Sequence, residues 1–135
     1  MAYNATLEVF GKTYGVLECE YEFVQAVDIT GRPSDRPRGG LISLVIQSPA
    51  GSDLSLYEWM RDKDTTEDGN IKFKINDKAQ FSDKVITFRN AYCVRLYEYF
   101  NSNNSMPMYM KLGIQAETIS IGTENRDGCE FQMID

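Results

Sequence analysis

Hydrophobic and polar residues alternate with a period of two along most of this 135-residue chain. Successive side chains of a β-strand point to opposite faces of a sheet, so this alternation predicts strands with one buried and one solvated face. The alternating segments span residues 5–10, 13–27, 41–48, 71–77, 84–100, 106–116 and 117–122. Gly11 and Lys12, between the first two segments, favour a turn, so these two strands are expected to form a hairpin.

The apolar positions of each segment define the face that is expected to lie against the core. These positions are Ala5, Leu7, Val9, Leu17, Cys19, Tyr21, Phe23, Ile42, Leu44, Ile46, Ile71, Phe73, Ile75, Ile86, Phe88, Tyr92, Val94, Leu96, Phe100, Met106, Met108, Met110, Leu112, Ile114, Ile119 and Ile121. Asn90 and Glu98 interrupt the fifth segment, which favours a bulge or a second contact surface there. The parity of the apolar positions changes after Ile114, which predicts a bulge or a strand break near Ala116–Thr118.

One segment changes from period two to the helical period. Leu56, Trp59 and Met60 fall at positions i, i+3 and i+4 and predict a short helix with a narrow apolar stripe. Ser52 or Asp53 is suited to cap its N-terminus, because a side-chain oxygen there accepts a hydrogen bond from a backbone N–H that has no partner within the helix. Trp59 is expected to anchor this helix to the core.

Together the segments predict a mainly β fold. We expect an antiparallel β-barrel, closed or nearly closed, of six to eight strands with one short helix at its side. Closure would remove exposed strand edges. The chain has neither a repeat nor a linker, so residues 1–135 are expected to form a single domain. Residues 123–135 are expected to be a polar and loosely held tail, apart from Phe131, Met133 and Ile134.

The composition of the chain narrows its chemistry. It contains no histidine, so catalytic and metal sites built on histidine are excluded. Cys19, Cys93 and Cys129 are odd in number and have no CxxC spacing, so no disulfide framework is expected; Cys19 and Cys93 lie in apolar strand patterns and are predicted to be buried. No phosphate-binding glycine motif is present, and the acidic run at residues 62–68 lacks the spacing of a calcium loop. We therefore expect no catalytic residue, no metal and no cofactor.

Charge and hydropathy limit the partners of the chain. The net charge of −6 argues against general nucleic-acid binding, which needs a positive surface. No apolar run approaches the roughly 20 residues that cross a membrane, and the N-terminus lacks the pattern of a signal peptide. We expect no membrane insertion and a cytoplasmic protein, with export without a cleaved signal peptide still allowed.

Three glutamates, Glu18, Glu20 and Glu22, alternate with apolar residues in the second segment. Alternate residues of one strand lie in a row about 6.5–7 Å apart, so these carboxylates do not converge on a metal ion or a reacting group. They predict a solvated strand face or, alternatively, a charged interface.

Residues 28–39 interrupt the strand pattern as a stiff, basic arm. Three arginines and two aspartates give the arm a net charge of +1, so the remainder of the chain carries −7. Two prolines fix φ and remove backbone donors, which excludes the arm from a regular strand ladder, and its glycines allow sharp turns. The residues expected to carry a function of the arm are Asp28, Gly31, Arg32, Pro33, Arg36, Arg38 and Gly39.

Composition leaves two interpretations of the arm. It is a plain solvent loop, or it docks onto an identical neighbour, where its arginines meet carboxylates such as Glu18 or Glu20. Head-to-tail contact of the second kind is heterologous and builds rings or filaments.

Five segments follow one another in a specific order: ATLEVFGKTYGVLECEYEF, DITGRPSDRPRGGLIS, LSLYEWM, GNIKFK and ITFRNAYCVRLYEYF. This ordered set resembles the Hcp (TssD) family, the tube proteins of type VI secretion systems, in its Bacteroidota branch, over about residues 2–121. The resemblance implies a fold similar to phage tail-tube proteins, with six copies closed into a ring. It also implies rings stacked into a hollow tube that a contractile sheath expels, partners among spike, baseplate and effector proteins, and secretion through the type VI apparatus. The loop of residues 28–39 would reach onto the adjacent subunit.

We therefore predict a structural subunit without catalytic activity that assembles with copies of itself. The alternative is a monomeric barrel that binds a small ligand or a carbohydrate, with Tyr92, Tyr97 and Tyr109 in a pocket. A deep interior cavity would favour this alternative. An enzyme that uses a pair of carboxylates is a third interpretation and needs two convergent acids in a cleft.

Overall fold

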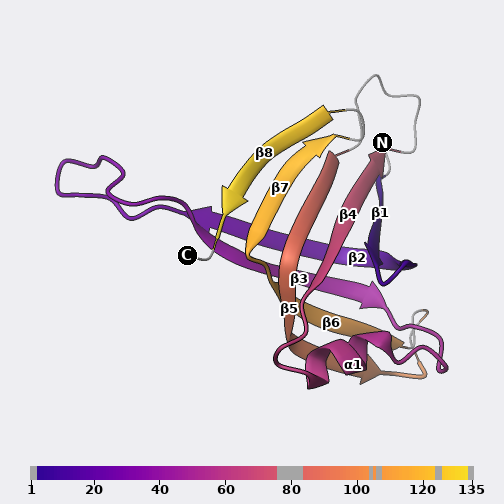
Figure 1. Cartoon of the computed structure of the whole chain (residues 1–135). Coiled ribbons are helices and arrows are strands. Elements are labelled where there is room, and N and C mark those ends of the chain that lie inside the picture. Colours follow the sequence, from indigo (N-terminus) through magenta and orange to yellow (C-terminus); the bar gives the residue numbers. More distant parts are fainter. Residues whose placement is uncertain (1–2, 76–83, 104, 106–107, 124–125, 134–135) are drawn as a thin grey trace.

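The structure is a computed structural model of the whole chain, and it describes residues 3–75, 84–103, 105, 108–123 and 126–133. Strands dominate the described residues, with one short helix after the third strand (Figure 1). The elements in chain order are β1 (Tyr3–Val9), β2 (Lys12–Val24), β3 (Arg38–Gln47), α1 (Ser55–Arg61), β4 (Glu67–Ile75), β5 (Lys84–Phe100), β6 (Met108–Gln115), β7 (Thr118–Thr123) and β8 (Arg126–Gln132).

Six of these strands close into a ring, and all of the pairings are antiparallel. The order is β4-β1-β2-β3-β6-β5, and β4 also pairs with β5, which closes the ring. β7 pairs with the first half of β5, and β8 continues the sheet beyond β7. The predicted antiparallel barrel with a side helix is confirmed, as is the β1–β2 hairpin.

The interior of this barrel is filled with side chains. The buried hydrophobic residues are Leu7, Val9, Tyr14, Ile42, Leu44, Ile46, Leu56, Trp59, Ile71, Ile86, Phe88, Ala91, Cys93, Met110, Leu112, Ile114, Ala116, Ile119 and Met133. Most of them are the apolar positions that the alternation predicts. A filled interior does not favour a barrel built to hold a small ligand.

Two bulges in β5 change which residues face the core. Asn90 has a positive φ of 50°, and the register with β4 slips at this point, so the inward face moves from Phe88 to Ala91 and Cys93. A second slip against β6, at Val94, turns Leu96 back toward the core. The bulge predicted at Asn90 is therefore present. The prediction that Tyr92 and Val94 face the core is wrong, because both lie in the stretch where the parity is reversed, and both are exposed.

Other predicted core positions are exposed for related reasons. A register shift between Val16 and Glu18 turns Leu17 outward, while Val16 packs against the core. Phe100, the last residue of β5, pairs with Met108, the first residue of β6, and both are exposed. Met106 lies outside the described residues.

The helix α1 packs on β5 through part of its predicted stripe. Leu56 and Trp59 are buried, and the Trp59 indole Nε1 donates a hydrogen bond to the carbonyl oxygen of Ala91 over 3.2 Å. The Trp59 ring also meets Phe10 edge to face, with 5.4 Å between the ring centroids. Met60 is exposed, contrary to the prediction, because a helix of two turns buries only the side that touches the sheet. Leu54 holds the N-cap position, without a side-chain cap bond.

The break predicted near residue 116 is confirmed. β6 ends at Gln115 and β7 begins at Thr118. The backbone N–H of Ala116 donates to the carbonyl of Gly40, and that of Glu117 donates to the carbonyl of Arg89. These bonds tie the segment between β6 and β7 to the start of β3 and to β5.

The polar part of the tail differs from the prediction of a loosely held segment, and Ile134 lies outside the described residues. Residues 126–132 form β8, which pairs with β7. Phe131 stacks on Phe23 with 4.1 Å between the ring centroids, and Met133 is buried. The apolar residues among the polar ones thus tie the tail to the end of β2.

The three cysteines are free thiols. Cys93 is buried as predicted, and Cys19 is partly buried against the core; burial raises the pKa of each thiol to about 11. Cys129 is exposed on β8. None of the helices in the described residues has the length and hydrophobicity to span a membrane.

Candidate assembly surface

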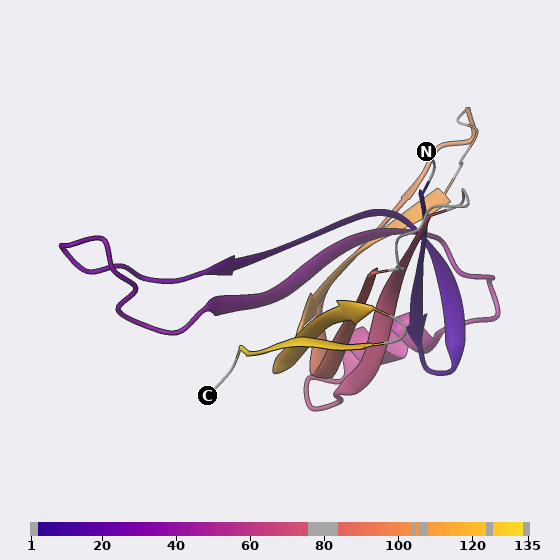
Figure 2. The ribbon, with the colours of Figure 1, turned by 90° about the horizontal axis from the view of Figure 1, so that it is seen from above.

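The arm projects far from the barrel as a narrow hairpin between β2 and β3 (Figures 1 and 2). β2 ends at Val24 and β3 begins at Arg38, so the irregular segment covers residues 25–37. Arg38 and Gly39, which the sequence places in the arm, belong to the start of β3 and pair with the end of β2. Within the irregular part the two sides meet only in an isolated bridge between Val27 and Pro33, which agrees with the predicted absence of a regular ladder.

The tip of the arm is held by the carboxylate of Asp28. Its Oδ1 accepts hydrogen bonds from the backbone N–H of Thr30, from the Thr30 hydroxyl and from the backbone N–H of Arg32. Gly31 has a φ of 87° and its N–H donates to the Asp28 carbonyl. The Thr30 hydroxyl, followed by the Arg32 amide, holds the pKa of Asp28 below its ordinary value. The tip is therefore a defined turn.

The arginines of the arm differ in their surroundings. The guanidinium of Arg38 forms an ion pair of 3.0 Å with Asp35, and the Asp35 carboxylate also accepts the backbone N–H of Arg36. These two bonds, the Arg36 amide first, lower the pKa of Asp35. The Arg32 guanidinium forms no such bond with the described part of the chain. Arg38 thus has an acid partner within its own arm, whereas Arg32 extends into solvent.

Glycine is required where the arm joins the sheet. Gly39 has a φ of 154°, and a Cβ at this position would lie 2.2 Å from the carbonyl oxygen of Glu22. Gly40 has a φ of 90°, and a Cβ there would lie 2.9 Å from the Cβ of Met133. Any side chain at these positions would push β2 and the tail away from β3, so the two glycines fix the root of the arm.

The three candidate glutamates are exposed on the outer face of β2, as the alternation predicts. They lie along two neighbouring grooves, and Glu20 lines both of them. Glu20 and Glu22 line a shallow groove with Val24 and Leu41 at the root of the arm. Glu18 lies in a second groove, with Arg95 and Lys111 among its lining residues.

Two strand edges at opposite sides of the four-stranded wall β2-β3-β6-β5 are open. β1 pairs with β2 only as far as Gly15, and beyond Val16 the described strands offer β2 no partner except β3. β4 pairs with β5 only up to Ala91, after which β5 pairs with β6 alone among the described strands. Open edges carry unpaired backbone N–H and C=O groups.

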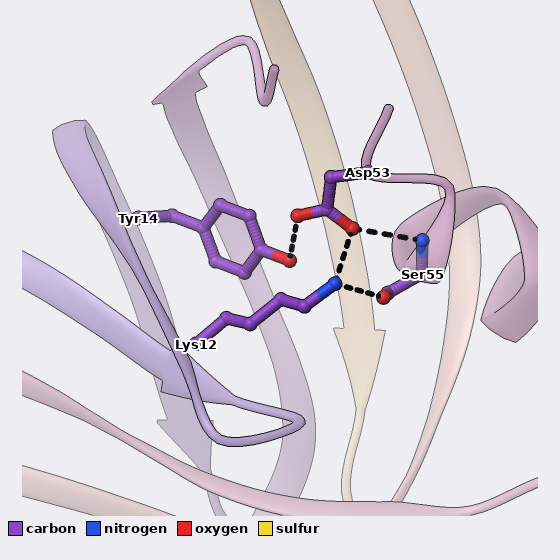
Figure 3. Close-up of polar contacts among 4 residues, drawn as sticks. All are labelled: Lys12, Tyr14, Asp53 and Ser55. Carbon is purple, nitrogen blue, oxygen red and sulfur yellow. Dashed lines mark hydrogen bonds and ion pairs between the residues drawn. The ribbon is translucent and has the colours of Figure 1, made fainter. Parts of the chain in front are cut away.

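A polar cluster that the sequence did not reveal links the β1–β2 turn to α1. Figure 3 shows the Asp53 carboxylate between the Lys12 ammonium and the Tyr14 hydroxyl, which donate to it over 2.9 and 2.8 Å. Asp53 also accepts the backbone N–H of Ser55, and Lys12 donates to the Ser55 hydroxyl. The Lys12 bond, followed by the Ser55 amide, holds the pKa of Asp53 well below its usual range. Burial, followed by the bond to Asp53, raises the pKa of Tyr14.

A second carboxylate fastens the same loop and helix. Glu98 on β5 accepts hydrogen bonds from the hydroxyls of Ser48 and Tyr57. The bond to Glu98 raises the pKa of Tyr57 to about 12. Partners about forty to fifty residues apart leave no local signal in a sequence, so neither cluster was predictable.

The tyrosines of the ligand-binding alternative do not converge on a pocket. Tyr92 and Tyr97 are exposed on the outer surface, with the Lys111 ammonium 5.5 Å from the Tyr97 ring centroid. Tyr109 packs against Tyr99 instead. Within the described ranges, no group of three or more cysteine and acidic side chains is placed to hold a metal ion.

The comparisons with known proteins agree on one family. Residues 1–127 match the family described as hemolysin coregulated protein Hcp (TssD). Hcp1 from Flavobacterium johnsoniae has a similar solved structure, with 34% sequence identity, a TM-score of 0.78 and coverage of 96% of this chain and 98% of that one. No curated protein matches the chain.

More distant structures share the fold. Hcp1 from Salmonella typhimurium has 8% identity and a TM-score of 0.76, with coverage of 97% of this chain and 95% of that chain. The secreted protein Hcp3 from Pseudomonas aeruginosa has 10% identity and a TM-score of 0.69, with coverage of 99% and 100%. At these identities the likeness concerns the fold alone.

Proposed function

Because the chain belongs to the Hcp (TssD) family of type VI secretion tube proteins, we propose that copies of it close into rings of six that stack into a hollow tube. Like the other members of its family, the chain is a structural tube protein and not an enzyme. Expulsion by a contractile sheath, contact with spike and baseplate proteins, and transport of effectors in the tube are further parts of this proposal. So is its path, from the cytoplasm through the type VI apparatus without a cleaved signal peptide.

The projection of the arm away from its own barrel is the main observation that supports this proposal. The tip of the arm has no surface of its own chain to rest on (Figure 2). An ordered turn at the end of a long hairpin costs conformational entropy, which contact with another molecule can offset. The arm is basic and the rest of the chain carries −7, so a second copy offers it a complementary surface.

The open edges of β2 and β5 support contact between copies as well. They lie at opposite sides of one wall, so the edge of one copy can pair with the other edge of the next in a head-to-tail manner. Such heterologous contact closes into a ring when the rotation between neighbours fits. Glu18, Glu20 and Glu22 on β2 would then lie beside this contact.

Native mass spectrometry of the purified protein tests the proposal directly. We expect a species of six chains, or stacks of such rings. A protein that stays strictly monomeric at high concentration and low salt would contradict it.

The docking role of the arm has its own test. Replacing Arg32 and Arg36 with glutamate is expected to raise the dissociation constant of the ring at least tenfold, because two attractive contacts with an acidic neighbour become repulsive. Surface charges away from the core change stability little, so the midpoint of unfolding is expected to stay within about 2 °C.

A matched control separates the arm from net charge. Replacing Arg61 and Lys63 with glutamate gives the same change of charge at the C-terminal end of α1, on the barrel and not on the arm (Figure 1). This variant is expected to assemble as the wild type does. Equal assembly of the arm variant and the wild type would reject the docking role.

A further inference from the structure

The tip of the arm presents a single large apolar side chain. The side chain of Ile29 is fully exposed, so no other part of its own chain covers it. It lies inside the turn that Asp28 holds through bonds to Thr30 and Arg32. The backbone that carries the isoleucine is thus already ordered, so binding through this side chain costs less conformational entropy than binding through a flexible loop.

The groove at the root of the arm offers a matching surface. It measures about 500 Å³ and is lined by Glu20, Tyr21, Glu22, Val24, Gly39, Leu41 and Ser43. Val24 and Leu41 supply apolar surface and are 51% and 46% exposed. The two glutamates lie beside this apolar surface on β2.

The tip and the groove each combine apolar surface with charge, and their charges are of opposite sign. Arg32 follows Ile29 by three residues and has no acid partner in the described part of its own chain. The glutamates stand beside apolar surface in the groove, so an isoleucine seated there brings the arginine to the carboxylates. The tip cannot fill the groove of its own chain, because the hairpin extends away from the root at which the groove lies (Figures 1 and 2).

We propose that Ile29 of one copy is the anchor of the subunit contact and seats on Val24 and Leu41 of a second copy, with Arg32 facing Glu20 and Glu22. This assignment rests on the self-assembly proposed above and names the surface that receives the arm. Residues that anchor protein interfaces are typically apolar or arginine side chains in a pocket near the centre of the contact. The contact is heterologous, so every copy uses its tip once and its groove once.

Substitutions at position 29 test the anchor. Ile29→Ser removes the apolar contact and is expected to raise the dissociation constant of the ring at least tenfold, measured by native mass spectrometry and sedimentation velocity over a concentration series. Ile29→Val keeps most of the apolar surface and is expected to change the constant less than about threefold. Thermal unfolding of the monomer is expected to be unchanged in both, because no other part of its own chain covers Ile29.

A control variant shows whether any exposed apolar residue would give this effect. Leu54→Ser removes another exposed side chain, before α1, and is expected to leave the dissociation constant at the wild-type value. If Ile29→Ser also assembles as the wild type does, the anchor is rejected while ring formation itself stands. If the wild type forms no assembly, the proposed function fails first.

A charge exchange tests the acid partner. Arg32→Glu and Glu22→Arg are each expected to weaken assembly, and the double variant is expected to recover at least part of the loss, because opposite charges then face each other again. A double variant no better than the product of the two single effects would reject the pairing of Arg32 with Glu22. Recovery in a mixture of the two single variants, where each arm meets a complementary groove, would confirm that the contact joins different copies.

Discussion

Asp53 connects parts of the chain that lie about forty residues apart. Its carboxylate accepts from Lys12 and Tyr14 on β2 and from the Ser55 amide at the start of α1 (Figure 3). Its side chain is only 15% exposed, so these bonds are partly shielded from water. The loop between β3 and α1 carries few apolar residues that could pack against the core. The hydrogen bonds of the Asp53 carboxylate hold this loop to β2 instead.

Replacing Asp53 with asparagine is expected to lower the free energy of unfolding at pH 7 by about 1–2 kcal/mol, since charge-assisted hydrogen bonds are lost. The folded protein holds the pKa of Asp53 below its ordinary value. The stabilisation is therefore fully present above about pH 4, the pKa of an unfolded aspartate, and is lost as the pH falls through the folded pKa. Urea unfolding at a series of pH values measures the difference between wild type and variant.

Asp64→Asn is the control for this change, since Asp64 is exposed and lies outside the cluster. It is expected to change the free energy of unfolding by less than about 0.5 kcal/mol at every pH. A difference between Asp53→Asn and wild type that stays constant down to pH 2 would contradict the assignment.

Among the elements, β8 takes on a role that its polar sequence hides. It extends the sheet beyond β7 and brings Phe131 onto Phe23, close to the root of the arm. Met133 beyond it is buried, and the Cβ of Met133 lies where a side chain at Gly40 would have to go. The last strand therefore supports the place where β2 and β3 leave the barrel.

Phe131→Ala is expected to lower the free energy of unfolding by about 2 kcal/mol, because a partly buried stacked ring is lost. Hydrogen exchange of the backbone amides at the end of β2 is expected to accelerate in the variant. Glu130→Ala, which removes only an exposed ion pair with Arg89, serves as the control and is expected to cost less than about 0.5 kcal/mol. Unchanged exchange at Phe23 and Val24 would mean that the tail does not support the arm.

The whole molecule separates its charges between the arm and the remainder. The arm carries +1 against −7 for the rest of the chain, and Arg32 is exposed in the turn at the tip of the arm. Net charge of one sign on the body drives copies apart, while a cation at the end of a long arm draws them together at one place. The proposed contact therefore selects a single orientation of neighbouring copies.

Salt is expected to reduce the effect of the arm charge. The ratio of the dissociation constants of Arg32→Glu and wild type should fall as sodium chloride rises from about 0.1 M to about 1 M, because the screening length shrinks from about 10 Å to about 3 Å. Using this ratio cancels the screening of repulsion between the acidic bodies, which is common to both proteins. A ratio that does not depend on salt would show that Arg32 acts through packing and not through charge.

Much of the fold was predictable because its signals are local. Leu7 and Val9 lie two positions apart, as do Ile42, Leu44 and Ile46, and this spacing predicts strands and their buried faces. All five residues are buried. The parity change after Ile114 predicts the break before β7, and it is present. Such features depend on the geometry of one strand alone.

Predictions failed where one extra residue in a strand reverses its faces. The interruption at Asn90 indicated a bulge, but the second slip at Val94 carries no mark in the sequence, and so Tyr92 and Val94 were assigned to the wrong face. The residues of β8 are polar enough to suggest a loosely held tail, and pairing with β7 overrides this local preference.

The sequence by itself determined the antiparallel strands, the short helix, the stiff basic arm and the outward row of Glu18, Glu20 and Glu22, because periodicity, proline and charge act along the chain. Only the tertiary structure decided which strand edges stay open, which glutamates share a groove with Val24 and Leu41, and that Ile29 is fully exposed. These features depend on distances between residues that are far apart in sequence, and the closure of the barrel sets those distances.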